Sequence, residues 1–228
     1  IRAVESIALG VSEVKLIDIT SAYAAIANNG ILRKPLGITT IFDNEGRMVK
    51  EFNSESKEVA DASHIFILRD MMKSVILNGT GSSIRWKYKF FNPAAGKTGT
   101  SQEKKDAWFV GFTPQITIGV WVGLDDQSME LGQYGAKAAL PIFAQTINQL
   151  YDRSYFSYNS GEIILANSPS ENKYDWIQPN DILMIDICET ECCMKTDWCN
   201  SYKEYFQENN LPSSDCDETL INPLMRFE

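Results

Sequence analysis

Three stretches of the chain repeat apolar residues at the spacing of an α-helix. The first is predicted to begin with a cap at Ser12 and to end at Asn29-Gly30, because such a pair readily adopts the left-handed conformation of a helix stop. The second is predicted to begin after a capping Asp61 and to end at Gly79, and the third to span residues 138–151. The first two apolar faces consist of Leu16, Ile19, Tyr23 and Ile26, and of Ile65, Leu68, Met72 and Val75.

The segments between these helices have the pattern of strands. Residues 38–42 and 47–52 flank the turn signal Asn44-Glu45-Gly46, which predicts a hairpin. Three more strands are predicted at residues 95–101, 107–112 and 116–124. The resulting order is helix, hairpin, helix, three strands and helix. It predicts an α/β protein of the α+β type, with helices packed on an antiparallel sheet.

Composition sets the broad class of protein. The chain has 228 residues, of which 44% are hydrophobic and 11% aromatic, enough for one large domain or a medium domain with an appendage. The net charge of −9 argues against nucleic acid as a partner, because binding a polyanion requires clustered cations. His64 is the single histidine, so a histidine-rich metal site is excluded and most serine–histidine chemistry with it.

Charge and cysteine are concentrated at the C-terminal end. Residues 156–228 contain 14 acidic and 4 basic residues, against 16 acidic and 17 basic residues in positions 1–155. A boundary is predicted near Ser154 to Ser160, where the last helical pattern gives way to a polar run. We therefore expect one domain over residues 1–155 and a small acidic extension over 156–228. The extension holds all five cysteines, Cys188, Cys192, Cys193, Cys199 and Cys216.

The N-terminal sequence indicates a piece of a longer chain. It begins at Ile1, with no methionine, basic leader or cleavage site. The most apolar stretch, residues 116–124, is shorter than the roughly 20 residues that a membrane-spanning helix needs. Any membrane anchor is therefore expected upstream.

The segment richest in candidate chemistry is Gly96-Lys97-Thr98-Gly99-Thr100, on a predicted strand. Alternate side chains of a strand share a face, so Thr98 and Thr100 are expected on one face and Lys97 on the other. Gly99 would let a ligand or another backbone approach closely. The segment combines a cation, two hydroxyls and an accessible backbone.

With its surroundings, this segment resembles the transpeptidase domain of class A, bifunctional penicillin-binding proteins, over essentially residues 1–155. Lys-Thr-Gly is the third motif of penicillin-binding proteins and class A β-lactamases. The extension matches features of the C-terminal extension that some of these proteins carry, in Ile187-Cys188, Cys199, Tyr205-Phe206, Pro212 and Cys216-Asp217. The matching motifs of the domain are Ala8-Leu9-Gly10, Ser21-Ala22-Tyr23-Ala24, Asn78-Gly79-Thr80-Gly81, Ala95 to Thr100, Asp106 to Pro114, Val120 to Asp125 and Ala138 to Phe143.

The resemblance implies a serine β-lactamase-like transpeptidase fold and an enzyme that cross-links peptidoglycan by acyl transfer. A serine attacks the D-alanyl-D-alanine end of one stem peptide, D-alanine leaves, and the amine of a second stem resolves the acyl-enzyme. The implied ligands are peptidoglycan stem peptides and the β-lactams that mimic them, with no cofactor and no metal. The implied location is extracytoplasmic, at the outer face of the cytoplasmic membrane.

The same resemblance implies roles for the motif residues. Lys97 would attract the terminal carboxylate of the substrate and support proton transfer, and Thr98 and Thr100 would donate hydrogen bonds to that carboxylate. Gly99 belongs to the same substrate-binding strand. The backbone N–H of Thr100 would be one of two oxyanion donors, the other belonging to the nucleophilic serine.

The family's nucleophile motif Ser-x-x-Lys and its Ser-x-Asn motif both lie far upstream of Lys-Thr-Gly. Ser157-Tyr158-Asn159 fits the second motif by letters but follows Lys97, and we interpret it as a boundary loop. We infer that the chain is the C-terminal half of a transpeptidase domain, inactive alone and completed by the upstream half. Four Ser-x-x-Lys strings occur and each has an ordinary interpretation: Ser12/Lys15, Ser54/Lys57, Ser101/Lys104 and Ser170/Lys173.

Several other residues receive no site assignment. His64 is interpreted as a structural or surface histidine, Trp108 and Phe109 as core residues of a strand, and Asp125-Asp126 as a solvated turn. The cysteine cluster is open to two interpretations, zinc or disulfides, and its spacing lacks paired Cys-x₂₋₄-Cys knuckles. The resemblance implies a disulfide between Cys188 and Cys199.

Two alternatives to the enzyme remain open. One is a noncatalytic interaction module on the same fold, with the acidic extension as its binding surface. The intact Lys-Thr-Gly-Thr segment favours the enzyme, because an interaction module has no need of it. The other is a fragment of a β-lactamase or D,D-carboxypeptidase, which would share Lys-Thr-Gly but not the wider match around Trp108 and Trp121.

Overall fold

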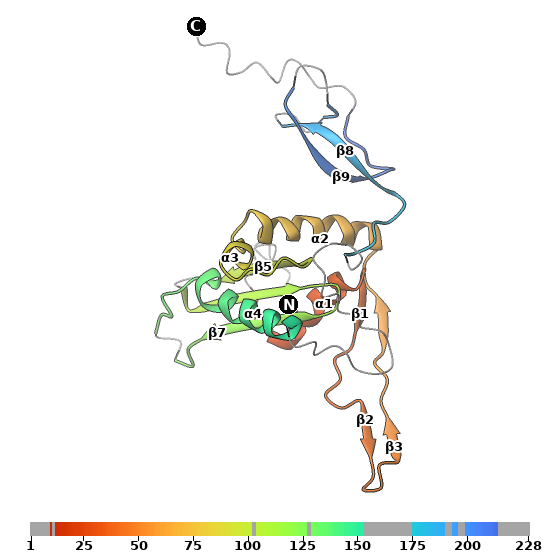
Figure 1. Cartoon of the computed structure of the whole chain (residues 1–228), viewed down its shortest axis with the longest axis vertical. Coiled ribbons are helices and arrows are strands. Elements are labelled where there is room, and N and C mark those ends of the chain that lie inside the picture. The colour runs from red at the N-terminus through yellow and green to blue at the C-terminus, as the bar shows by residue number, and fades with distance from the viewer. Residues whose placement is uncertain are drawn as a thin grey trace. The chain divides into compact units, whose positions relative to one another are not determined.

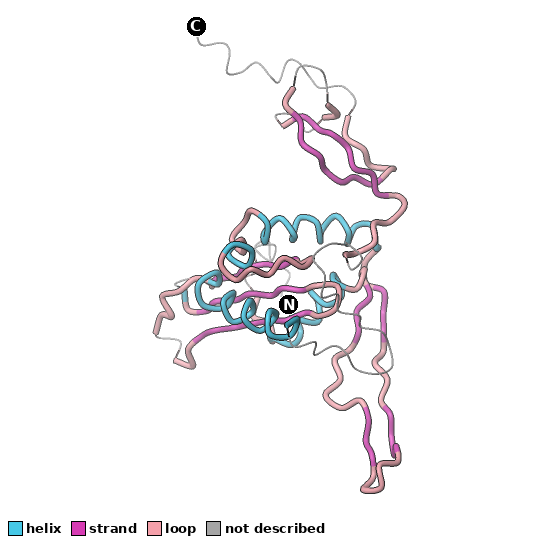
Figure 2. Tube along the Cα trace, viewed as in Figure 1, coloured by secondary structure: helices cyan, strands magenta, loops and turns pink. Residues whose placement is uncertain are grey.

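The computed structural model describes residue 10 and residues 12–101, 104–126, 129–152, 175–189, 193–195 and 199–213. It divides into two compact units, one formed by residues 1–61 and 68–176 and the other by residues 62–67 and 177–228. Figures 1 and 2 show their helices and strands. Within the described ranges, no helix has the length and apolar character needed to cross a membrane. The boundary predicted near Ser154 to Ser160 lies outside the described residues.

A three-stranded antiparallel sheet is the centre of the first unit. Its strands are β5 (Ala95–Thr100), β6 (Asp106–Phe112) and β7 (Thr117–Gly123), in the order β5-β6-β7. The register places Lys97 opposite Val110, Thr98 opposite Phe109 and Thr100 opposite Ala107. These strands confirm the three predicted over residues 95–124.

In the described part of the chain, four helices accompany the strands: α1 (Leu16–Ala27), α2 (Ala62–Leu77), α3 (Ser83–Trp86) and α4 (Gly135–Asp152). The predicted stop of α1 is confirmed, because Asn29 and Gly30 have φ values of 51° and 87°. Helix α2 begins directly after Asp61, as predicted, and α4 begins three residues earlier than predicted. The fold class of helices with antiparallel strands is confirmed.

The prediction that Ser12 caps the first helix is wrong. Helix α1 begins at Leu16, and its N-cap residue is Lys15, which makes no side-chain capping bond. A capping side chain must directly precede the helix to reach the N–H groups of its first turn. Ser12 stands four positions before the first helical residue, too far to do so.

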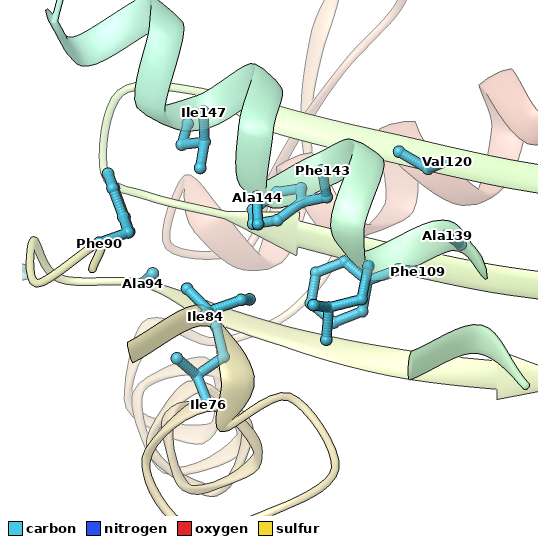
Figure 3. Packing of buried hydrophobic residues seen from close by; sticks show 11 residues of the cluster. Ile76, Ile84, Phe90, Ala94, Phe109, Val120, Ala139, Phe143, Ala144 and Ile147 are labelled. Atoms are coloured by element: carbon cyan, nitrogen blue, oxygen red, sulfur yellow. The ribbon is translucent and has the colours of Figure 1, made fainter. Parts of the chain in front are cut away.

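The main core lies between α4, β6, β7 and the segment from α2 to α3. Figure 3 shows Phe143, Ala144 and Ile147 of α4 on the side of the helix that faces Phe109, Ile84 and Ile76. Phe109 and Phe143 have ring centroids 4.8 Å apart. Burial of apolar surface in this cluster anchors the sheet and the end of α2 in one body. Its buried members are Ile76, Ile84, Phe90, Ala94, Phe109, Val120, Ala139, Leu140, Phe143, Ala144 and Ile147.

A second cluster forms around Phe112. It contains Met72 of α2, Ala95 of β5 and Trp176, with Tyr23 of α1 packed against it. The Tyr23 and Trp176 rings both meet Phe112 edge-on, at centroid distances of 6.4 and 5.7 Å. Burial raises the pKa of the Tyr23 hydroxyl above its ordinary value. Residue 176 therefore belongs to the first unit although it follows the predicted boundary.

Two pairs of short strands form a nested hairpin between α1 and α2. The outer pair is β1 (Ile31–Arg33) with β4 (Ser56–Glu58), and the inner pair is β2 (Thr40–Phe42) with β3 (Met48–Glu51). The inner pair confirms the predicted hairpin, whereas β1 and β4 were not predicted. The turn holds Gly46 at a φ of 78°, and Arg47 pairs with Asp43 at 2.8 Å. These hydrogen bonds lower the pKa of Asp43.

The second unit contains an antiparallel hairpin and the first turn of α2. Its strands are β8 (Ile182–Cys188) and β9 (Ser201–Gln207), neither of which was predicted. Cys188 is disulfide-bonded to Cys199, with Cα atoms 5.7 Å apart, and Cys193 is also disulfide-bonded. From α2, Ser63 donates a hydrogen bond to Asp181 at 2.6 Å, and the Phe66 ring meets Tyr205 edge-on at 5.1 Å.

Candidate active site

Strand β5, which carries Lys97, Thr98, Gly99 and Thr100, lies at an edge of its sheet. In the described part of the chain it pairs with β6 on one side only. Lys97 and Thr100 are exposed, and Thr98 and Gly99 are half-buried. The four predicted site residues are therefore brought together on one accessible strand.

The backbone of this strand presents hydrogen-bonding groups to the open edge. In an antiparallel pair, residues that bond to the partner strand alternate with residues whose N–H and C=O point away from it. The N–H of Ser101 donates to Asp106 O at 3.0 Å, which puts Ser101 in the class that bonds to β6. By alternation, the backbone groups of Thr100 and Thr98 point to the open edge.

The amine of Lys97 lies along this edge. Its Nζ donates a hydrogen bond to the carbonyl oxygen of Thr98 at 2.8 Å. The bond holds the cation at the backbone of the strand, in an exposed place where a carboxylate can reach it. The strand thus offers a positive charge next to outward N–H groups.

The hydroxyls of Thr98 and Thr100 have different partners. Thr100 Oγ1 accepts a hydrogen bond from the N–H of Gly135, at the start of α4, at 3.2 Å. Because this contact uses an oxygen lone pair, the hydroxyl hydrogen of Thr100 is left for donation. Thr98 Oγ1 lies 2.8 Å from the hydroxyl oxygen of Thr80, and either group could be the donor.

The two glycines of the segment are required by packing against β6. A Cβ at Gly96 would lie 2.9 Å from Val110 O, and one at Gly99 would lie 3.0 Å from the Cβ of Trp108. Gly99 therefore lets the strand lie close to a large aromatic side chain of its neighbour.

Two serines of the Ser-x-x-Lys strings form hydrogen bonds with the backbone, and the other two precede α1 or lie outside the described residues. Ser54 donates to Lys34 O at 2.6 Å within the nested hairpin. Ser101 accepts the N–H of Asp106 at 2.8 Å and closes the turn after β5. Ser12 precedes α1, and Ser170 lies outside the described residues, as do Ser157 and Asn159.

The remaining candidate residues belong to elements other than β5. His64 is exposed in the first turn of α2, and Asp125 and Asp126 are exposed after β7. Phe109 is fully buried in the core, and Trp108 packs against Trp121, with ring centroids 6.2 Å apart. No group of three or more metal-ligating side chains occurs among the residues that the structure describes.

Thr80 contacts the candidate site through Thr98, although the sequence pattern assigned Thr80 no role. It is the third residue of Asn78-Gly79-Thr80-Gly81, which follows α2, and it contacts the centre of the β5 motif. The signal available in the sequence was a threonine between two glycines at a helix end. This signal does not indicate which strand the loop contacts.

Comparison with known proteins finds relatives for most of the chain. Residues 2–148 match the family model described as the penicillin binding protein transpeptidase domain. Penicillin-binding protein 1A of Aquifex aeolicus is 36% identical over 190 residues, which cover 81% of this chain and 24% of the relative. The protein of the same name from Clostridium tetani is 28% identical over 216 residues, covering 91% of this chain and 25% of that protein. The chain spans about a quarter of the length of these relatives.

Solved structures show the same fold. The crystal structure of penicillin-binding protein 1A from Haemophilus influenzae superposes with a TM-score of 0.73 at 21% identity, covering 93% of this chain and 34% of that one. The D,D-transpeptidase domain of a peptidoglycan glycosyltransferase from Eggerthella lenta gives a TM-score of 0.50 at 21% identity, covering 62% of this chain and 33% of that one. At these identities the likeness concerns the fold.

Proposed function

The chain belongs to the penicillin-binding protein transpeptidase family, and on that premise we propose that it supplies the Lys-Thr-Gly-Thr strand of a peptidoglycan D,D-transpeptidase. In the proposed reaction a serine Oγ attacks the carbonyl carbon of the penultimate D-alanine of a stem peptide. The bond to the terminal D-alanine breaks, and that residue leaves as the free amino acid. The amine of a second stem peptide then attacks the ester and releases the serine.

One observation carries this proposal: the open edge of β5 combines the Lys97 amine with outward backbone groups and with the Thr98 and Thr100 hydroxyls. An extended peptide laid along such an edge can form main-chain hydrogen bonds with it. Its terminal carboxylate would meet Lys97 and the two hydroxyls, since charge-assisted hydrogen bonds are the stronger ones. Lys97 would also support proton transfer in the site, and the N–H of Thr100 would serve as an oxyanion donor.

We propose that the nucleophilic serine and the Ser-x-Asn motif belong to an upstream part of the same transpeptidase domain. The coverage of about a quarter of the relatives supports this, because it leaves ample sequence for both motifs. The structural hydrogen bonds of Ser54 and Ser101 support it too. The isolated chain would then be catalytically inactive, and its ligands, stem peptides and β-lactams, would bind to the completed domain.

We also propose an extracytoplasmic location, at the outer face of the cytoplasmic membrane, with residues 156–228 as an acidic extension of which Trp176 packs in the core of the first unit. The disulfide between Cys188 and Cys199 supports such a location, because disulfides persist in oxidising compartments. The concentration of acidic residues after residue 155 supports such an extension.

Covalent labelling by penicillin tests the function. We expect intact-mass spectrometry to find one penicilloyl adduct on the longer protein and none on the isolated 228-residue chain. A β-lactam ring opened by a serine adds its whole mass, so the adduct is unambiguous. An adduct on Ser12 or Ser101 would overturn the assignment of the nucleophile to upstream sequence. A longer protein that contains Ser-x-x-Lys and takes up no penicillin would overturn the enzymatic function and favour the noncatalytic interaction module.

A further inference from the structure

We propose that Thr80 is a positioning residue of the transpeptidase site, which orients the Thr98 hydroxyl toward the carboxylate of the substrate. This inference rests on the proposed function and deepens it. Its basis is the 2.8 Å contact between the hydroxyl oxygens of Thr80 and Thr98, which joins two segments 18 residues apart in the sequence. Thr98 is the residue that follows Lys97 on the open strand.

Thr80 is held in place by the end of α2. A Cβ at Gly79 would lie 2.8 Å from the Cα of Val75, and one at Gly81 would lie 3.2 Å from Val75 O. Both flanking glycines therefore allow the loop to fold tightly against the last turn of the helix. Hydrogen bonds from Gly79 N to Ser74 O at 3.0 Å and from Gly81 N to Val75 O at 2.9 Å close this turn.

Core packing fixes both sides of the loop. Ile76, in the last turn of α2, and Ile84, in α3, are fully buried in the main core (Figure 3). The other partner of the contact, Thr98 on β5, is fixed by its pairing with Phe109 of β6, which is also fully buried. The distance between the two hydroxyls is thus set by well-packed elements, and the β-branched threonine side chain adds a restricted χ1 rotamer.

The contact decides where the hydroxyl hydrogen of Thr98 points. A hydroxyl carries one donor hydrogen and two acceptor lone pairs. To bind a carboxylate, Thr98 must donate its hydrogen to the ligand, and it can then accept a hydrogen bond from Thr80. In that arrangement the two hydrogen bonds run in one direction and strengthen each other. Thr80 is thus the group that can hold the Thr98 hydrogen in this direction.

Two substitutions distinguish this role from that of a purely structural hydrogen bond. They are Thr80→Val and Thr80→Ser, made in the longer protein of which we propose this chain is part. Valine keeps the shape of threonine and removes the hydroxyl, whereas serine keeps the hydroxyl. The probes are benzylpenicillin, which carries a carboxylate, and its methyl ester, which does not. We expect T80V to lower the second-order rate of acylation by benzylpenicillin about fivefold, the effect of one neutral hydrogen bond. The methyl ester should be affected less than twofold, and T80S should restore the rate with benzylpenicillin.

A matched control is S54A, which removes a side-chain hydrogen bond of 2.6 Å within the nested hairpin. It should leave both rates at the wild-type value. Equal loss of rate with acid and ester in T80V, or a T80V rate equal to the wild-type rate, would overturn the role of Thr80. Wild-type protein that reacts with neither probe would instead overturn the proposed function, so the two failures are distinguishable.

Discussion

The indole N–H of Trp176 donates a hydrogen bond to the backbone carbonyl oxygen of Ala27, 149 residues earlier in the chain, at 2.9 Å. The guanidinium carbon of Arg69 lies 4.7 Å from the centroid of the same ring, and Lys73 pairs with Asp175 at 3.1 Å. Burial lowers the pKa of Arg69 to about 10, partly offset by Asp175. Arg69 therefore stays charged at neutral pH, and the cation–π contact with Trp176 is retained.

Replacement of Trp176 should strongly destabilise the first unit. We expect W176A to lower the free energy of unfolding by about 3–5 kcal/mol, because a large buried side chain is removed. W176F should cost about 1 kcal/mol for the lost hydrogen bond, with some further loss of packing. Urea unfolding followed by near-UV circular dichroism measures both. Equal stability of wild type and W176A would show that the ring does not anchor this segment.

Gly111→Ala should overpack the core between β6 and α4. The added Cβ would lie 2.6 Å from Phe143 Cζ and 2.7 Å from Phe109 Cε1, inside a closely packed cluster. Such overpacking costs about 1–3 kcal/mol in the free energy of unfolding. Gly37→Ala is the matched control, because its Cβ would meet nothing within 4 Å, and its thermal midpoint should remain near that of wild type.

Lys97→Ala should slow acylation of the longer protein by penicillin. Loss of one charge-assisted hydrogen bond in the transition state corresponds to about 10- to 100-fold in rate. Arginine at this position should also be poorer than lysine, because its broad planar group differs in shape from an ammonium. Lys50→Ala serves as the control, since Lys50 stacks on Phe52 in the nested hairpin. Unchanged acylation in K97A would remove Lys97 from the site.

Burial of Tyr151 should make the free energy of unfolding decrease at alkaline pH. Its hydroxyl donates to Gln115 Oε1 at 2.8 Å, and burial raises its pKa, partly offset by a hydrogen bond with Thr113. A pKa raised above the unfolded value of about 10 contributes stability that is present below pH 10 and lost as the pH rises through the folded value. We expect Y151F to be less stable at neutral pH and to lose less stability between about pH 9 and about pH 11. Urea unfolding at several pH values tests this, with Y134F, at a half-exposed tyrosine, as the control.

The disulfide between Cys188 and Cys199 should stabilise the second unit. It closes a loop with a sequence separation of 11 residues, which corresponds to about 2–3 kcal/mol in the chain-entropy model. We expect reduction, or the C188S/C199S double variant, to accelerate amide hydrogen exchange in β8 and β9 and to leave β5, β6 and β7 unchanged. Non-reducing peptide mapping tests the pairing itself. A free Cys188 thiol, or stoichiometric zinc released on denaturation, would contradict it.

The sequence pattern was sufficient to predict the helices and strands that are specified by residues close together in the chain. The apolar period of α1 and α2, the turn of β2 and β3 and the three central strands were predicted close to their observed bounds. The three-residue strands β1 and β4 were not, because so short a strand has no period of its own and exists only through its partner. The strands β8 and β9 were missed for a different reason: each has seven residues and β8 is largely apolar, so the sequence carried a strand signal within the acidic extension that the prediction did not use.

The chemical groups of the candidate site were evident from Lys97, Thr98, Gly99 and Thr100 alone, because a cation, two hydroxyls and glycine on one strand identify the segment. Which groups of the strand face outward depends on its pairing with β6, and the partner of the Thr98 hydroxyl depends on how α2 packs against the sheet. Contacts such as those of Thr80 with Thr98 and of Trp176 with Ala27 join residues far apart in the chain. Local preferences act between near neighbours in sequence, so only burial of the shared core could bring these residues together.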